Sequence, residues 1–572
     1  MNPGYRIVRD SSYPGIPHVF NCFRAMKKIT LSIVLLLFCT VALCAAQPVK
    51  LVFDYDSPRQ TIHSFGASDC WRAQYVGCWP EEKRNAIADL LFSSETDASG
   101  SPRGIGLTLW RFNIGSGSHE RGDSSGVASP WRRTECFLDQ DGEWNWTKQA
   151  GQQWFIKAAR ERGVPYILGF SITAPYFMTK NGMARASENT PYANIRPDRY
   201  RDYAAFMAEV CSRLDMDYLS PINEPQWEWV VSRQEGMQAT NSECATLIRM
   251  LDQELSRRKA HTKVVFGEAA DIRYLYRNNT DKPMRDNQIA DMFTPSGKNY
   301  IGDCDCVAKI VSGHSYWSTW PLDTLVTTRR QLNEALPSGY GYWQTEYCPM
   351  EQNPDNPDGG AQRDTGMDLA LYIARVIHHD LTVAEASSWQ SWTALSEANY
   401  KDALIWIGDK DTLHHPWKKP TADFMEEGKT DGAFLPSKYL WALGNYSFFV
   451  RPGMVRLAPA AGHGGEDGYG LMSSAYIDKA TGRLVTVIVN YGESPATAAV
   501  DVKHLPDGSC LSSFKCYETS SRCDLKYVGE YACGNVPVPA RSVVTLVSDY
   551  LCKKNMARVT LRRSKILIFA VR

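Results

Sequence analysis

The chain has 572 residues, of which 44% are hydrophobic and 22% are charged, which is the composition of a folded globular protein. This composition excludes wholesale disorder and a collagen-like structure. Lys and Arg together number 63, as do Asp and Glu, so the whole chain is formally neutral. The charge is unevenly distributed, because residues 1–46 carry +4 and residues 551–572 carry +7, which leaves −11 for residues 47–550. An acidic body argues against a nucleic-acid-binding protein, which needs a basic surface, so we expect no nucleic-acid partner.

Residues 26–46 have the layout of a secretory signal peptide. Met-Lys-Lys at 26–28 precedes an apolar run of 18 residues, Ile29 to Ala46, that ends in small residues. A membrane anchor is the alternative reading, but no basic stop-transfer cluster follows. No second run of this kind occurs, so we expect a secreted or periplasmic protein with no membrane span in its mature form. An outer-membrane lipoprotein anchored at Cys44 is disfavoured, because Leu43 is bulkier than the small residue that such a site requires.

Thirteen of the 16 cysteines lie beyond residue 46. Export permits disulfides, and the cluster Cys510, Cys516, Cys523 and Cys533 predicts one or two bridges. Cys304 and Cys306 with His314 have the residue types of a metal site, but no CxxC pair or HExxH helix accompanies them. We expect burial or disulfides for the two cysteines, no bound metal and no cofactor.

Between about residues 60 and 395, short β-rich runs alternate with amphipathic helical patterns. The predicted strands are 62–69, 106–113, 164–171, 218–223, 263–268, 308–316, 339–346 and 383–389. The predicted helices are 154–162, 199–214, 245–258, 324–336 and 367–379. Eight strands separated by helices indicate an α/β protein with a (β/α)8 TIM barrel. A doubly wound open sheet is the alternative, but no glycine-rich phosphate loop follows the first strand.

After about residue 450 the pattern changes to short apolar runs separated by turn residues. The runs are 469–476, 483–490, 498–503, 515–519 and 542–547. They predict a fused antiparallel β-sandwich, with a first strand supplied by residues 49–55 upstream of the barrel. The expected organisation is therefore a lead and signal peptide (1–46), a strand joining the sandwich (47–60), the barrel (61–435), the sandwich (436–550) and a basic tail of unknown role (551–572).

Two carboxylates stand out at the predicted strand ends, where the active site of a barrel lies. Glu224 lies in Ser220-Pro-Ile-Asn-Glu-Pro-Gln-Trp227, and Glu346 lies in Tyr342-Trp-Gln-Thr-Glu-Tyr347. These positions place the two residues on the fourth and seventh strands of one barrel mouth. Glycoside hydrolysis with retention needs such a pair, one carboxyl as nucleophile and the other as acid/base. We predict that Glu224 and Glu346 are catalytic.

Other polar and aromatic side chains at strand ends suit a saccharide. Flat aromatic faces pack against sugar rings, and the chain has 17 Trp. Arg111 is suited to keeping a nucleophile ionised, Asn223 to bonding the sugar 2-OH, and either His314 or Tyr316 to a hydrogen bond with the nucleophile. The residues expected to bind substrate are Asp69, Arg111, Asn223, His314, Tyr316 and Trp389, the last as a sugar platform at the end of the eighth strand.

The motifs together resemble glycoside hydrolase family 30. They are Phe65-Gly-Ala-Ser-Asp69, Trp110-Arg-Phe-Asn-Ile114, Ser220–Trp227, His314-Ser-Tyr316, Thr345-Glu-Tyr347 and Tyr446-Ser-Phe-Phe-Val-Arg-Pro-Gly453. The resemblance implies a retaining enzyme with Glu224 as acid/base and Glu346 as nucleophile, and a sandwich fused to the barrel. The segment Pro221–Trp227 is most similar to the endo-β-1,6-galactanase-like branch, whereas Thr173-Ala-Pro-Tyr-Phe-Met178 departs from many relatives.

The resemblance implies a monomeric enzyme that hydrolyses a plant-type polysaccharide, with β-1,6-galactan as the leading substrate. The alternatives are another specificity of the family, such as β-1,6-glucan, xylan or a β-glucoside. A catalytically inactive carbohydrate-binding protein on the same scaffold is a further alternative, which the presence of both Glu224 and Glu346 disfavours.

Overall fold

The computed structural model describes residues 47–549, apart from 280, 416–417 and 508. The segments assigned from the sequence to a signal peptide and a basic tail lie outside the described residues. The described residues from Val49 onwards belong to one compact unit. In the described part of the chain, no helix combines the length and the apolar character that crossing a membrane requires.

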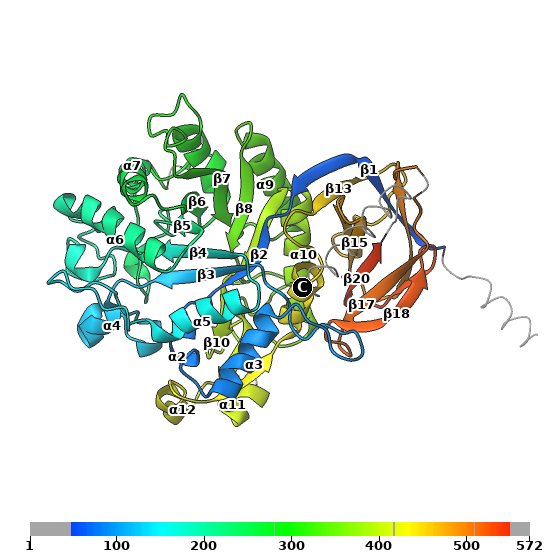
Figure 1. The fold of residues 1–572 in the computed structure, drawn as a ribbon, viewed down its shortest axis with the longest axis horizontal. Coiled ribbons are helices and arrows are strands. Elements are labelled where there is room, and N and C mark those ends of the chain that lie inside the picture. The colour runs from blue at the N-terminus through cyan, green and yellow to red at the C-terminus, as the bar shows by residue number, and fades with distance from the viewer. Residues whose placement is uncertain (1–46, 280, 416–417, 508, 550–572) are drawn as a thin grey trace, which may run out of the picture. The chain divides into compact units, whose positions relative to one another are not determined.

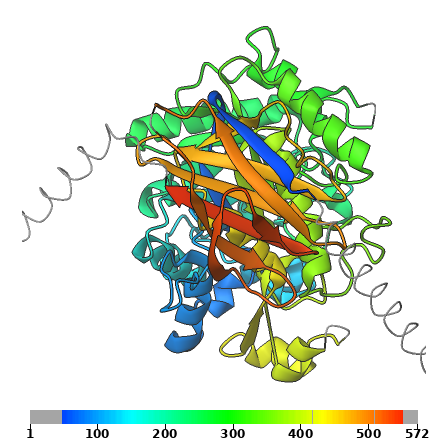
Figure 2. The same ribbon diagram turned by 90° about the vertical axis from the view of Figure 1, so that its right-hand side faces the viewer.

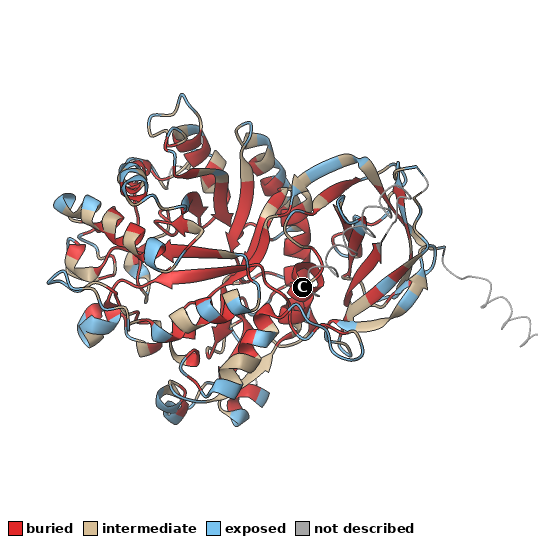
Figure 3. Ribbon diagram, viewed as in Figure 1, coloured by how far each residue is buried: buried red, intermediate tan, exposed pale blue. Residues whose placement is uncertain are grey.

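Eight parallel strands close into a barrel in which each strand pairs with the next along the chain and β9 returns to β2 (Figure 1). They are β2 (Ser64–Ser68), β3 (Leu109–Ile114), β4 (Tyr166–Ser171), β5 (Tyr218–Ser220), β6 (Lys263–Ala269), β7 (Val307–His314), β8 (Gly341–Glu346) and β9 (Ala386–Ser391). Every strand predicted from the sequence overlaps one of these, so the (β/α)8 barrel is confirmed. Its strands are buried almost throughout, as expected for a parallel sheet covered by helices (Figure 3).

Helices surround the barrel on its outer side (Figure 1). The longer ones are α3 (Glu81–Phe92), α5 (Ala150–Glu161), α6 (Tyr200–Arg213), α7 (Asn241–Arg258), α9 (Leu322–Ala335) and α10 (Met367–Thr382). The shorter ones are α2 (Ala73–Val76), α4 (Ser118–Arg121) and α8 (Arg273–Tyr276). Helix α7 begins at a capping box in which the Thr240 side chain accepts from the Glu243 N–H and the Glu243 carboxylate accepts from the Thr240 N–H. These reciprocal bonds explain why the chain turns into a helix at this point.

Residues 393–436 form a small subdomain beside the barrel that the sequence pattern did not reveal. Its sheet contains β10 (Thr393–Ser396), β11 (Ala403–Gly408) and β12 (Ala433–Pro436), and it carries α11 (Lys410–His414) and α12 (Ala422–Glu427). Strands of four to six residues give too short a pattern for a period of two to be recognised.

The second domain is a nine-stranded, largely antiparallel sheet in the order β18-β17-β20-β15-β14-β13-β1-β16-β19 (Figure 2). Its strands are β1 (Val49–Thr61), β13 (Val455–Pro459), β14 (Leu471–Asp478), β15 (Arg483–Asn490), β16 (Ala496–Lys503), β17 (Ser513–Thr519), β18 (Lys526–Ala532), β19 (Val536–Val538) and β20 (Ser542–Asp549). Residues from both halves of the sheet meet in one apolar core, so the sheet folds over on itself. The expectation of a sandwich whose first strand precedes the barrel is confirmed.

The outer face of this sheet packs on the barrel. In β15, Leu484 and Ile488 belong to the sandwich core, whereas Val485, Val487 and Val489 belong to the core shared with the barrel. Helix α10 contacts β14, β15 and β20 on one side and β9 on the other. This position explains why α10 is buried almost all round, its charged residues Arg375 and Asp380 included. Helix α13 (Lys438–Ser447) lies in the same layer against β17 and β20.

Every cysteine that the structure describes is unpaired, so the bridges expected among Cys510, Cys516, Cys523 and Cys533 are not formed. Cys516 is buried in the sandwich core as an apolar residue, whereas Cys510 is exposed. The expected burial of Cys304 and Cys306 is confirmed.

A reciprocal pair of hydrogen bonds joins the barrel side to the sandwich. Thr545 Oγ1 accepts from Asn445 Nδ2 at 2.9 Å and donates to the Asn445 carbonyl at 2.7 Å, and both residues are fully buried. Thr545→Val should lower the free energy of unfolding by about 1–3 kcal/mol, because it leaves buried polar groups of Asn445 without their hydrogen-bond partner. Urea unfolding followed by circular dichroism measures this loss. Thr497→Val, in the partly exposed strand β16, is the matched control, and equal midpoints for the two variants would contradict the prediction.

Candidate active site

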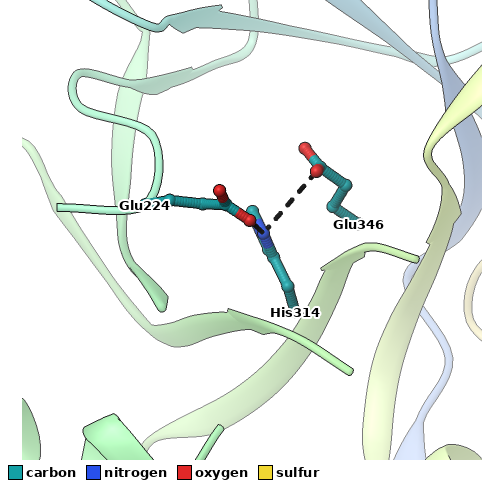
Figure 4. A group of neighbouring side chains, drawn as sticks. All are labelled: Glu224, His314 and Glu346. Atoms are coloured by element: carbon teal, nitrogen blue, oxygen red, sulfur yellow. Dashed lines mark hydrogen bonds and ion pairs between the residues drawn. The ribbon is translucent and has the colours of Figure 1, made fainter. Parts of the chain in front are cut away.

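The candidate site lies at the carboxyl ends of the barrel strands. Glu346 is the last residue of β8 and His314 the last residue of β7, whereas Glu224 follows β5. Glu224 has a left-handed backbone with φ of 46°, and its N–H donates to the Glu268 carbonyl at 3.0 Å. This local turn aims the Glu224 side chain toward the mouth. Because parallel strands end at one face, residues more than 100 positions apart meet there (Figure 4).

Glu224 and Glu346 face each other across the mouth, as the sequence predicts. A carboxyl oxygen of each and a ring nitrogen of His314 all lie within 4.8 Å of one another. Both carboxyls are buried, with residue exposures of 7% and 4%, so they are screened from bulk water yet remain reachable. Two carboxyl groups at this distance affect each other's protonation strongly.

Arg111 of β3 connects the site. Its Nη1 donates to Glu346 Oε2 at 2.6 Å, and its Nη2 donates to Asn223 Oδ1 at 2.8 Å and to Glu268 Oε2 at 2.9 Å. The guanidinium carbon lies 3.7 Å from the centre of the Phe170 ring. The side chain is fully buried. Arg111 therefore supports the carboxylates from inside the barrel, and its expected contact with substrate stays a prediction.

His314 and Tyr316 each contact a different catalytic carboxyl. His314 Nδ1 lies 2.8 Å from Glu224 Oε1 and 3.8 Å from Glu346 Oε1. The Tyr316 hydroxyl donates to Glu346 Oε1 at 3.0 Å. Of the two residues considered for a hydrogen bond with Glu346, Tyr316 is thus the donor, and His314 serves Glu224. Both are buried and act through the carboxyls.

Burial and neighbouring charges shift the pKa values of Glu224 and His314. Burial and the nearby charge of Glu346 raise the pKa of Glu224, although the hydrogen bond and charge of His314 oppose the rise. Burial alone would lower the pKa of His314, but the charge of Glu346 and the hydrogen bonds to Glu224 and Glu268 raise it to about 10. At neutral pH the site therefore holds a cationic imidazole beside a carboxyl that tends to keep its proton.

Asn223 and Asp69 differ in how their side chains are hydrogen-bonded. The Asn223 oxygen accepts from Arg111, which turns its amide N–H groups into the donors available for a ligand. Asp69 Oδ1 accepts from the Asn113 N–H at 2.9 Å and Asp69 Oδ2 from Gln152 Nε2 at 2.9 Å. Both oxygens are engaged within the protein and the residue is buried, so Asp69 fixes the end of β3. That Asp69 also binds sugar stays a prediction.

Trp389 lies within β9, two residues before the strand ends, and its indole N–H donates to Asp380 of α10 at 2.9 Å. The side chain is fully buried, because its position on the strand faces the helix layer. Trp389 therefore belongs to the wall of the barrel, and its expected role as a sugar platform stays a prediction.

Other tryptophans supply aromatic surface after the strand ends. Trp227 and Trp317 are partly exposed and stack with ring centres 4.7 Å apart and planes 10° from parallel. Trp392, also partly exposed, meets Trp71 edge to face at 5.4 Å. All four follow strands in the sequence, and that position is the signal that identifies them.

Glu268 is a further polar residue of the site, one to which no role is assigned from the sequence. It is fully buried in β6 and touches Arg111, with Thr345 Oγ1 donating to its Oε1 at 2.8 Å. Burial would raise the pKa of Glu268, but the hydrogen bond of His314 and the charge of Arg111 outweigh burial and lower it to about 2. Its position at a strand end was visible, but no motif marked it.

Glu224, His314 and Glu346 also have the residue types of metal ligands and lie close enough together to be considered as such. The 2.8 Å contact between His314 and Glu224 is a hydrogen bond, however, and the Glu346 carboxylate already bonds Arg111 and Tyr316. Hydrogen bonding within the protein therefore accounts for the arrangement, and we treat the three residues as an acid–base group.

His314 should remain an imidazolium at neutral pH and lose its proton only as the pH rises toward about 10. ¹⁵N NMR of histidine-labelled protein, with His314→Gln to assign the signal, measures this titration. The shift also predicts that the stabilising contribution of His314 is complete below the ordinary histidine pKa of about 6.5 and is lost as the pH rises through 10. A neutral His314 at pH 8 would contradict the prediction.

Comparison with known proteins agrees with the fold. Residues 48–406 match the sequence profile of O-Glycosyl hydrolase family 30. A conserved exported protein from Bacteroides fragilis is 35% identical, with a TM-score of 0.78 over 87% of this chain and 99% of that one.

Two more distant structures share the fold. The catalytic domain of the family 30 xylanase C from Talaromyces cellulolyticus is 19% identical, with a TM-score of 0.60 over 87% of this chain and 99% of that one. An endo-β-1,6-glucanase is 14% identical, with a TM-score of 0.58 over 87% of this chain and 93% of that one. The profile match spans more than half of the chain and includes both carboxylates of the barrel mouth. The chain therefore belongs to glycoside hydrolase family 30 and is a glycoside hydrolase.

Proposed function

We propose that this protein is an exported, monomeric, retaining endo-β-1,6-galactanase. The observation that carries the retaining mechanism is the distance between the catalytic carboxyls, whose nearer oxygens lie within 4.8 Å. Retaining enzymes place the two groups about 5–5.5 Å apart, whereas inverting enzymes leave about 6.5–9.5 Å for a water molecule. Nearer oxygens within 4.8 Å of each other leave little room for a water molecule between Glu224 and Glu346, which supports the retaining class.

In the first step Glu346 attacks the anomeric carbon and forms a glycosyl ester, while the bond to the leaving oxygen breaks. Glu224 gives its proton to that oxygen. Arg111 and Tyr316 each donate to a different oxygen of Glu346, so they orient the attacking carboxylate. The Asn223 amide is suited to donate to the sugar 2-OH, an interaction that strengthens in the transition state.

In the second step Glu224, now a carboxylate, removes a proton from water as the water attacks the same carbon. The ester bond breaks and Glu346 leaves as a carboxylate, again stabilised by Arg111 and Tyr316. Two displacements restore the β configuration. The raised pKa of Glu224 suits a residue that must be protonated at the start of each cycle.

The substrate class is supported by the sequence of the segment that carries Glu224, Pro221–Trp227, which resembles that of β-1,6-galactanases. The partly exposed stack of Trp227 and Trp317 offers flat apolar surface of the kind that sugar rings contact. The exported protein from Bacteroides fragilis, 35% identical, supports export of this chain as well. We propose that residues 1–46 are removed in that process.

The first test is a panel of polysaccharides with product sizing by chromatography. Arabinogalactan trimmed of its side chains should be cleaved into short oligosaccharides, because an endo enzyme cuts within the β-1,6-galactan backbone. β-1,6-Glucan and xylan are the matched controls. If xylan or β-1,6-glucan is degraded and galactan is not, the proposed galactan specificity is wrong and the degraded polysaccharide is the substrate. If no polysaccharide is hydrolysed, a carbohydrate-binding role is favoured.

The second test separates the roles of the two carboxylates. Glu346→Ala removes the group that forms the ester, so even substrates with activated leaving groups should react very slowly. Glu224→Ala removes the proton donor, so aryl glycosides with a good leaving group should still form the ester, whereas polysaccharide should not react. The expected loss on polysaccharide is about 100- to 10,000-fold.

Azide supplies the stereochemical readout. With Glu224→Ala it should attack the glycosyl ester and give a β-glycosyl azide. With Glu346→Ala it should attack the substrate directly and give an α-glycosyl azide. Glu235→Gln, which alters a buried carboxylate bonded to Ser118 and Thr134, is a control that should give no azide product. Reversed products would refute the assigned roles.

A further inference from the structure

Glu268 has the contacts of a residue on which the whole site depends. Its Oε2 accepts from Arg111 Nη2 at 2.9 Å and lies 3.5 Å from His314 Nε2. Its Oε1 accepts from Thr345, and its own N–H donates to Ser312 Oγ at 3.2 Å. Its carbonyl accepts the N–H of Glu224. Glu268 is thus held from several sides. It is hydrogen-bonded to Arg111 and forms an ion pair with His314, and both cations touch the catalytic carboxyls.

The buried charges around Glu268 balance only when this carboxylate is counted. Arg111 and His314 each contribute one positive charge, Glu346 and Glu268 each contribute one negative charge, and a protonated Glu224 contributes none. Isolated charges are costly to bury, so a balanced set is the arrangement that a buried site favours. The other titratable groups packed against this set are Asp69, Cys70, Tyr316 and Tyr342.

We propose that Glu268 is the fixed counter-charge of the active site, a positioning residue that holds Arg111 and His314 in place and offsets their positive charge so that Glu224 retains its proton. This inference rests on the proposed acid/base role of Glu224. Glu268 touches no substrate in this arrangement, because it is fully buried beneath the residues that do. It acts through Arg111 on Glu346 and Asn223, and through His314 on Glu224.

Removing the negative charge of Glu268 should make Glu224 or His314 lose its proton at lower pH. Without the negative charge of Glu268 the site carries an excess of +1, which favours release of a proton from Glu224 or from His314. Activity that depends on protonated Glu224 falls as the pH rises through the pKa of that group. Glu268→Gln should therefore move this basic limb, or the His314 titration, to lower pH by about 1 to 3 units, the range of a neighbouring charge.

The experiment measures kcat/KM against pH for the wild type and for Glu268→Gln on the polysaccharide that the panel selects. A 2,4-dinitrophenyl glycoside of the same sugar is the reference, because its leaving group needs no proton. The basic limb should appear in the wild type with the polysaccharide and be absent with the reference. A limb that appears equally with both substrates refutes the acid role of Glu224, and hence the proposed function, before Glu268 is considered.

The remaining variants distinguish the effect of losing the Glu268 charge from the effect of a change in local structure. Glu268→Asp keeps the charge on a shorter side chain and should keep the wild-type basic limb even where kcat falls. Thr345→Val removes a hydrogen bond to Glu268 but no charge, and Glu235→Gln removes a different buried carboxylate, so both should also keep the limb. ¹⁵N NMR follows His314 in each protein.

Two results would overturn the counter-charge role. One is a Glu268→Gln variant in which neither the basic limb nor the His314 titration moves. The other is a wild-type His314 that is already neutral at pH 8, and this second measurement decides the matter even if Glu268→Gln does not fold. A downward shift in Glu268→Gln that is absent from Glu268→Asp supports the role.

Discussion

The interaction on which the rest of the site depends is the buried guanidinium of Arg111. It bonds Glu346 of β8, Glu268 of β6 and Asn223 of the loop after β5 at once. A planar cation with several donors in fixed directions is suited to this task, and a lysine could not replace it. Because the guanidinium is fully buried, loss of one of these partners would leave its charge poorly compensated.

Much of this architecture can be read from the sequence, and the reasons differ between its parts. The barrel strands are recognisable because long apolar runs alternate with helices of clear period, and Glu224 and Glu346 because motifs surround them. The side-chain directions of Trp389 and Asp69 could not be predicted from the sequence, because the direction of a side chain depends on where a strand ends to within one residue. Glu268 was overlooked because its importance comes from three-dimensional contacts with Arg111 and His314.

The subdomain at 393–436 and the shared layer between barrel and sandwich show a further limit. Short strands leave no periodic signal, and the burial of α10 on nearly every side becomes intelligible only when a second domain is seen to cover it. The same holds for β15, whose two faces serve two different cores. A pattern that is apolar throughout indicates burial without revealing what lies on either side.

Strand β1 has a consequence for how the protein reaches its folded state. It lies between β13 and β16 in the interior of the sheet, third from one edge, although about 400 residues separate it from either partner. A chain that emerges from its amino end, whether from a ribosome or through a membrane pore, exposes β1 long before those partners exist. The second domain therefore cannot be completed until nearly the whole chain has emerged, and contacts of such long range are slow to form. Protection of this early strand from other partners becomes a requirement of biosynthesis.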